Sequence, residues 1–119
     1  SLYSKPLIQL SRNGGNMQAE LIAKLKEFDP QRFVSKLIFD SERMRVVLFC
    51  LKAGQELAPH SAPSEVMFHC VEGTGKAIIG KDDIPLVPGA LVDCPPQVAH
   101  GLKAEKDLVV LAIIAPRPG

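Results

Sequence analysis

From residue 32 to residue 115 the chain is a series of short runs rich in apolar and β-branched residues, separated by turn residues. The runs are residues 33–39, 44–51, 65–72, 76–79, 84–87, 90–94 and 108–115. Glycine and proline breakers lie between the later runs, and residues 40–43 separate the first two as in a hairpin. Many short strands at regular spacing are typical of a β-sandwich or a closed antiparallel barrel. The sequence therefore predicts an all-β domain over residues 31–119.

One helix is predicted ahead of the strands. Met17, Leu21, Leu25 and Phe28 recur at spacings that line one face of a helix over about residues 16–28. The pair Asp29-Pro30 ends this pattern, because proline disfavours helical geometry in the residue before it. We expect residues 1–30 to form an N-terminal extension whose apolar helix face packs on the barrel or on a second copy of the chain.

Composition narrows the classes of partner. A chain of 119 residues with a net charge of +1 and scattered charges gives no reason to expect nucleic acid or a membrane surface as a partner. No apolar stretch approaches the roughly 20 residues that span a bilayer, and the first residues do not look like a signal peptide. The three cysteines, Cys50, Cys70 and Cys94, cannot all pair and lie in or beside apolar runs. These features predict a soluble protein of the reducing cytoplasm.

Two histidines forty residues apart each lie within a frame of glycine and proline. These frames resemble the two motifs of the cupin superfamily, G-x5-H-x-H-x3-E-x6-G and G-x5-P-x-G-x2-H-x3-N. Six residues fall at the motif spacing: Gly54, His60, Gly73, Gly89, Pro95 and His100. The resemblance implies a small, single-domain, RmlC-like cupin, which is a double-stranded antiparallel β-barrel of jelly-roll type. It also implies that both histidines line the interior of that barrel.

Four motif positions depart from the cupin pattern. Ala62 stands where the motif has its second histidine, Val66 where it has glutamate, Gln97 where it has glycine and Ala104 where it has asparagine. Typical cupins hold one divalent metal with four protein ligands. Of those four ligands the resemblance carries over only the two histidines, His60 and His100.

The strand predicted over residues 65–72 can present either of two faces to the interior. The spacing to Gly73 favours an inner face of Val66, Phe68 and Cys70, which would line a mainly apolar pocket with Val92 and the two histidines. A bulge near residues 63–64 would instead turn Glu65 and His69 inward, because a one-residue slip exchanges the two faces. Three histidines and one carboxylate would suit Zn, Fe, Ni or Mn as a cofactor. The sequence leaves both arrangements open.

Two candidate functions follow from the two possible inner faces of the strand at residues 65–72. The first is a binding module in which His60 and His100 orient a small polar ligand, with one divalent metal as a candidate cofactor. The alternative is a metal-dependent cupin enzyme, of the dioxygenase, isomerase or decarboxylase class, that adds Glu65 and/or His69. Alanine at either His60 or His100 is expected to abolish or greatly weaken metal or ligand binding and to leave the fold intact.

A homodimer is expected, because residues 7–10 and the strand at 108–115 are apolar and need cover.

Overall fold

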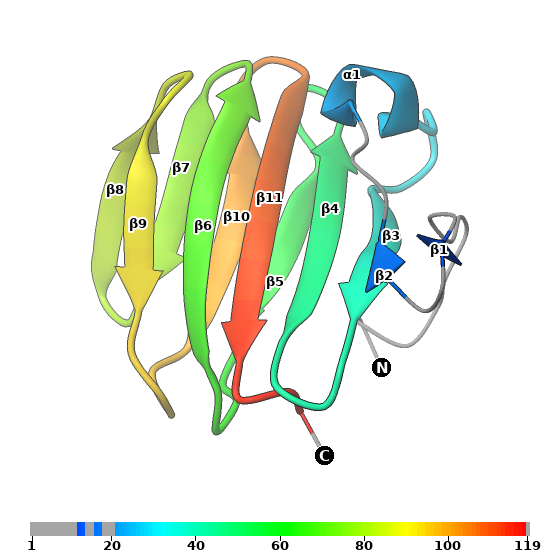
Figure 1. Ribbon diagram of the computed structural model, residues 1–119. Helices are drawn as coiled ribbons and strands as arrows, with labels where there is room; N and C mark the ends of the chain where they lie inside the picture. Colours follow the sequence, from blue (N-terminus) through cyan, green and yellow to red (C-terminus); the bar gives the residue numbers. More distant parts are fainter. Residues whose placement is uncertain (1–11, 14–15, 18–20, 119) are drawn as a thin grey trace.

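The computed structural model describes residues 12–13, 16–17 and 21–118, and it folds most of them into two antiparallel β-sheets (Figure 1). The first elements are β1 (Arg12–Asn13), β2 (Asn16–Met17) and α1 (Ile22–Leu25). The barrel strands are β3 (Val34–Asp40), β4 (Arg45–Leu51), β5 (Glu56–His60), β6 (Glu65–Glu72), β7 (Gly75–Ile79), β8 (Asp82–Leu86), β9 (Leu91–Cys94), β10 (His100–Ala104) and β11 (Leu108–Ala115). This arrangement confirms the predicted all-β fold.

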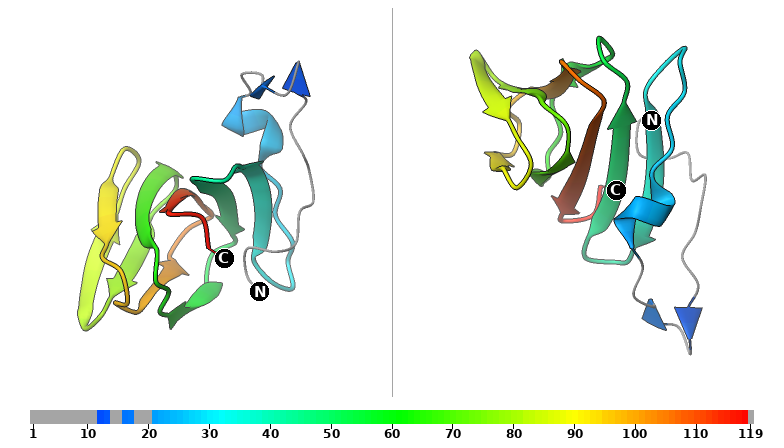
Figure 2. Two further views of the ribbon diagram at one scale, coloured as in Figure 1. Left: turned by 60° about the horizontal axis from the view of Figure 1, so that its bottom comes forward. Right: turned by 90° about the horizontal axis from the view of Figure 1, so that it is seen from above.

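The barrel consists of a five-stranded sheet facing a four-stranded sheet. The strand order is β3-β4-β11-β6-β9 in the first sheet and β5-β10-β7-β8 in the second, so the chain crosses repeatedly from one sheet to the other. Figure 2 shows the two sheets facing each other around the interior of the barrel. Among the described residues, strands β1 and β2 pair with each other and with no other strand. The predicted double-stranded barrel of jelly-roll type is therefore what the chain forms.

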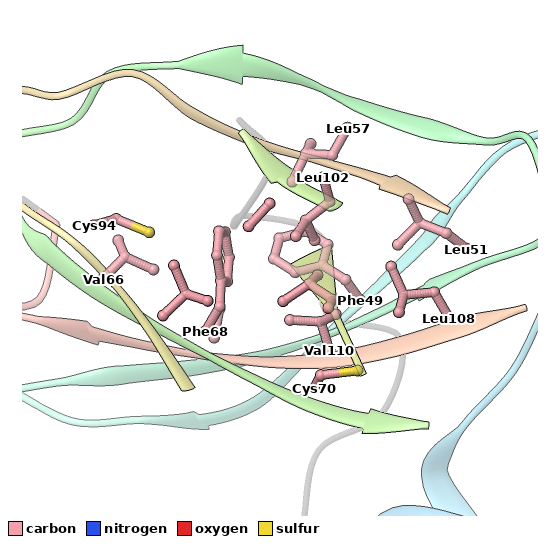
Figure 3. Close-up of a cluster of buried hydrophobic side chains, with 14 of the residues drawn as sticks. Phe49, Leu51, Leu57, Val66, Phe68, Cys70, Cys94, Leu102, Leu108 and Val110 are labelled. Carbon is pink, nitrogen blue, oxygen red and sulfur yellow. The ribbon is translucent and has the colours of Figure 1, made fainter. Parts of the chain in front are cut away.

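The interior is filled by side chains from alternate positions of both sheets. Figure 3 shows part of this core, in which Phe49, Phe68 and Leu102 from three different strands are packed together. A second, smaller cluster lies on the outer face of the five-stranded sheet, where Leu25 of α1 packs with four residues of that sheet: Val34, Leu48, Cys50 and Val109. Strand β11 contributes to both clusters, as expected for a strand that is apolar on both faces.

The helix is much shorter than the sequence pattern predicts. Asn16–Met17 form strand β2, residues 18–20 lie outside the described part of the chain, and α1 spans only Ile22–Leu25. Its last carbonyl, that of Leu25, accepts a 2.6 Å hydrogen bond from the Nζ of the buried Lys36 on β3. This carbonyl would otherwise receive the next intrahelical N–H, so the contact with the sheet competes with continuation of the helix. Leu25 and Phe28 pack on the sheet, but not as one long helical face.

Two of the barrel strands, β5 and β10, lie outside the runs that the sequence predicts, and they are the strands that carry His60 and His100. Strand β5 contains Pro59, which a central strand would not accommodate but which an edge strand such as β5 can. Strand β10 contains Gly101 and a register irregularity between His100 and Leu102. Proline and glycine therefore concealed both strands from an argument based on β-propensity.

The apolar segment at residues 7–10 lies outside the described residues. Among the residues that are described, no helix combines the length and apolar character needed to cross a membrane.

Candidate functional site

His60 and His100 lie side by side at one end of the barrel. His60 is the last residue of β5 and His100 the first of β10, and the two are direct partners in the antiparallel register. Their ring centroids are 4.6 Å apart, with the planes tilted by 54°. The rings of Phe68 and His100 form a T-shaped pair with a centroid distance of 5.8 Å. We call this part of the molecule the histidine end of the barrel.

The close approach of β5 and β10 depends on Gly101. A Cβ atom at this position would lie 2.5 Å from the carbonyl oxygen of Leu57 and 2.9 Å from the nitrogen of Pro59, closer than side-chain carbons come to backbone atoms. A larger residue would therefore push β5 away from β10. The glycine that follows His100 thus permits the strand spacing at which the two imidazoles are adjacent.

A tight turn ahead of β10 sets the orientation of the His100 ring. The turn consists of residues 95–98, in which the N–H of Val98 donates to the carbonyl of Pro95 at 3.2 Å and Gln97 adopts a left-handed φ of 70°. The carbonyl of Val98 lies 3.2 Å from Nδ1 of His100. A carbonyl oxygen can only accept, so Nδ1 carries the proton in this contact. In the neutral ring, Nε2 is then the acceptor.

The electrostatic environment favours a neutral His100. The side chain is almost completely buried, and burial lowers its pKa below the ordinary histidine value. The hydrogen bond to Val98 opposes this shift, and the nearby His60 adds to it. His60 is half-buried, so it is the more exposed member of the pair, although its Nδ1 atom is buried. The pair thus combines a partly exposed imidazole with a buried, neutral one.

The structure places Val66, Phe68 and Cys70 of β6 inside the barrel. All three are fully buried members of the interior core, and Val92 on the neighbouring strand β9 is buried in the same core. Val66 pairs with Cys94, which is also buried, and there is no register shift in this strand pair. The spacing to Gly73 thus indicates the correct face, and the walls beside the two histidines are apolar.

Glu65 and His69 lie on the opposite, outer face of β6, so the arrangement with an inward Glu65 and His69 does not form. Glu65 is exposed, and a hydrogen bond with the Asp93 carboxyl raises its pKa. His69 is half-buried between its register partners Leu91 and Leu111, and its Nδ1 has no hydrogen-bond partner among the described residues. The β6–β11 pair has a register shift between Val109 and Val110 of β11, far from Glu65. This shift does not turn Glu65 or His69 inward.

The three cysteines are free and buried, in agreement with their apolar sequence context. Burial raises the pKa of the Cys94 thiol to about 12, and the charge of Asp93 contributes. Burial also raises the pKa of Cys70 and of Cys50. All three thiols are therefore protonated at neutral pH, which does not suit a nucleophile or a thiolate ligand.

The residues at the histidine end do not fit a divalent metal held in the usual cupin manner. In the described ranges no group of three or more His, Cys, Asp or Glu side chains could hold a metal ion. Ala62 and the buried Val66 occupy the two remaining motif positions, and neither side chain has a donor atom. Catalytic metal sites usually have at least three protein ligands. The two imidazoles alone fall short of that number.

A cluster of charged residues at the same end of the barrel has no signal in the sequence motifs. The Asp40 carboxylate accepts hydrogen bonds from Nε of Arg45 at 3.2 Å and from Nε of Arg117 at 2.7 Å. The hydrogen bond with Arg117 is the main cause that lowers the pKa of Asp40 to about 2. The tail after β11 is held further by the Ser64 hydroxyl, which donates to the Pro116 carbonyl at 2.6 Å. These residues are far apart in sequence, so only the fold brings them together.

The fold and the site together define a class: a small antiparallel double-stranded β-barrel with an inward-facing histidine pair at one end. The sequence profile of the cupin domain family matches residues 47–114, which is more than half of the chain. The chain therefore belongs to the cupin family. A comparison with curated proteins finds no match.

Solved structures agree with this assignment. An RmlC-like cupin protein from Desulfovibrio desulfuricans is 37% identical, with a TM-score of 0.80 over 86% of this chain and 99% of that one. A protein from Thermus thermophilus is 28% identical, with a TM-score of 0.81 over 86% of this chain and all of that one. A mutant of salicylate 1,2-dioxygenase from Pseudoaminobacter salicylatoxidans, in complex with gentisate, shares the fold at 19% identity. Its TM-score is 0.66, over 70% of this chain and 25% of that one.

Proposed function

We propose that this cupin binds a small polar ligand directly through His60 and His100. The observation that carries the proposal is the pairing of a partly exposed imidazole with a buried, neutral one, at a centroid distance of 4.6 Å, beside buried apolar side chains. Sites for small molecules are typically apolar surfaces with a few convergent polar groups. The histidine end has this composition.

The chemistry of the two imidazoles indicates which ligand groups they would contact. Nδ1 of His100 is directed to the Val98 carbonyl, so the acceptor Nε2 would receive a hydroxyl or N–H donor of the ligand. His60, which is half-buried, would donate or accept according to its protonation state. Phe68 and Val66 would pack against the apolar part of the ligand.

The alternative function, a metal-dependent enzyme, requires ligands that the inner face does not offer. For Glu65 and His69 to face inward, the two faces of β6 would have to be exchanged. That exchange would turn Val66, Phe68 and Cys70 out of the core. Elemental analysis of natively purified protein tests this alternative. A stoichiometric metal that is lost on Glu65→Gln or His69→Ala would support the enzyme and contradict our proposal.

A ligand-observed NMR screen of small hydroxylated and acidic compounds tests the proposal directly. Wild type should bind at least one compound, His60→Gln should lose that binding, and His69→Gln should retain it. The last variant is a matched control, because it makes the same change on the outer face of the barrel wall. Hits that are indifferent to the His60 change, or a screen without hits, would contradict the proposal.

We also propose that the protein is a homodimer and works in the cytoplasm. The outer face of β6, β9 and β11 carries half-buried or exposed apolar side chains, namely Met67, Leu91, Leu111 and Ile113, which support pairing with a second copy. The three free thiols support a reducing compartment. The proposed ligand binding at the histidine end uses neither the outer face of these strands nor the three thiols. The proposals of a homodimer and of a cytoplasmic location are therefore independent of the proposal of ligand binding.

A further inference from the structure

Arg45 is a charged residue on the inner face of the barrel. Along β4 it precedes Val47 and Phe49 at alternate positions, and both of these are buried in the interior core. Its register partner on β11 is Ile114, which in turn pairs with Val66 on β6. Paired residues of antiparallel strands point to the same face. Since Ile114 and Val66 face the interior, the side chain of Arg45 leaves β4 on that face as well.

Arg45 also lies at the histidine end. Val66, in the same row of inward residues, is two positions from Phe68, whose ring meets His100. Strand β5, which ends at His60, lies behind β4 and β11 in Figure 1. The row that contains Arg45 and the pair of histidines therefore belong to the same end of the interior, on opposite sheets.

Asp40 fixes the position of this guanidinium. Two nitrogens of Arg45 contact the Asp40 carboxylate, Nε at 3.2 Å and Nη2 at 3.4 Å, and Arg117 contacts the same carboxylate through Nε and Nη2 at 2.7 and 3.0 Å. The Arg45 side chain is only 12% exposed. Two guanidinium groups and one carboxylate carry a net charge of +1, so the cluster has one positive charge beyond what Asp40 neutralises.

The contact with Asp40 uses one edge of the Arg45 fork. A guanidinium has five N–H donors, and those on Nη1 and on the second edge are directed away from a carboxylate that is bound through Nε and Nη2. Arginine is well suited to binding a second carboxylate in this way, because its planar fork matches the two oxygens. The acids nearest to this row on β6 and β9, Glu65 and Asp93, lie on the outer face and do not compete for the site.

We propose that Arg45 binds the carboxylate of a small organic acid, so that the ligand of this cupin is a hydroxy acid with its carboxylate at Arg45 and its hydroxyl at the histidines. The inference rests on the proposed function of His60 and His100, and it adds the class of ligand. Between the two polar ends the wall consists of Val66, Phe68 and Ile114, which predicts an apolar body between the carboxylate and the hydroxyl.

The competing explanation is a structural staple. Arg117 holds the tail against the hairpin of β3 and β4, through Asp40 and through its own N–H, which donates to the Arg43 carbonyl at 3.1 Å. In a staple alone, Arg45 would serve only as a second donor to the Asp40 carboxylate and would contact no ligand. The two explanations differ in what loss of Arg45 does to ligand choice.

The test uses lactate, β-hydroxybutyrate and mandelate, each beside its neutral amide. Binding is followed by the imidazole resonances of His60 and His100 in the full chain. In wild type at least one acid should bind about tenfold more tightly than its amide, as expected for a charge-assisted hydrogen-bonded pair. Arg45→Gln should abolish this preference. Arg43→Gln, an exposed arginine on the same hairpin, should retain it.

Arg45→Lys serves as a second variant should Arg45→Gln fail to fold: it keeps the charge, loses the fork, and should show a reduced preference for the acid. Equal binding of acids and amides in wild type overturns the carboxylate proposal and leaves the proposed function intact. A preference for the acid that survives in Arg45→Gln also overturns the carboxylate proposal and leaves the proposed function intact. Failure of all six compounds to bind at millimolar concentration also overturns it, whereas the proposed function fails only when the wider screen finds no ligand that depends on His60.

Discussion

The imidazole rings of His60 and His100 lie 4.6 Å apart, but they differ in how much they support the fold. His100 is 1% exposed, forms a T-shaped ring pair with Phe68 and is directed to the Val98 carbonyl, whereas His60 is half-buried at the end of an edge strand. The sequence suggests that both histidines can be replaced by alanine with the fold intact. The structure restricts that expectation to His60.

His100→Ala should therefore lower the free energy of unfolding by about 2 kcal/mol or more, because it leaves a cavity and removes a buried hydrogen bond. His60→Ala should cost less than about 1 kcal/mol. Urea denaturation of both variants measures the difference. Equal losses would show that His60 is as important to packing as His100.

Stability should fall on mild acidification. Burial lowers the pKa of His100 in the folded protein, so the unfolded chain binds this proton more readily. The stabilisation is complete above the unfolded pKa of about 6.5 and is lost as the pH falls toward the lower folded pKa, with a slope of at most about 1.4 kcal/mol per pH unit. Denaturation at several pH values, in chelator, tests this. His100→Gln should lose the slope and His69→Gln should keep it; a slope unaffected by His100→Gln would refute the assignment.

Gly101→Ala should separate the two histidines. The added methyl group would lie 2.5 Å from the Leu57 carbonyl oxygen, and backbone atoms cannot move aside as a flexible side chain can. Gly75→Ala is a useful comparison, because its methyl group would meet the backbone of Lys103 near the other end of β10. Both variants should lose stability, and only Gly101→Ala should shift the imidazole resonances of His60 and His100. Identical spectra would mean that β5 tolerates the displacement.

Gln97 occupies the cupin glycine position with a φ of 70°, in the left-handed region that costs non-glycine residues about 1 kcal/mol or more. Gln97→Gly should leave stability unchanged or raise it by up to about 1 kcal/mol, since relief of strain offsets the greater freedom of glycine in the unfolded chain. Gln97→Val should destabilise by more, because a β-branched residue fits this geometry poorly. Thermal unfolding of the three proteins ranks them, and a valine variant as stable as wild type would contradict the expected strain.

Leu91→Lys should convert the proposed dimer to a monomer. Leu91 is 67% exposed on the outer face of β9 beside His69, within the apolar surface proposed for pairing. Light scattering should give twice the chain mass for wild type and the single mass for the variant. Val87→Lys changes another exposed apolar residue, in the connection from β8 to β9, and should remain dimeric. A monomeric wild type would refute the dimer.

Much of the fold could be predicted because its signals are local. The run of residues 65–72 became β6 and the run of residues 108–115 became β11, both with unchanged bounds, since alternating and continuous apolar patterns depend only on neighbouring residues. The predicted length of the helix was wrong because it depended on contacts with a distant part of the chain. Its four-residue periodicity was real, but contacts with the sheet, including the Lys36 hydrogen bond, decided where the helix ended.

The sequence by itself determined the barrel class and the two histidines, because glycine, proline and histidine at fixed spacing are constraints on the backbone. Tertiary structure alone decided that β5 and β10 are strands, that Val66 rather than Glu65 faces the interior, and that Arg45 joins Asp40 and Arg117 at the histidine end. The physical reason is the same in each case. Strand pairing and the choice of an inner face depend on which distant segments meet, and that information is not contained in any single stretch of the chain.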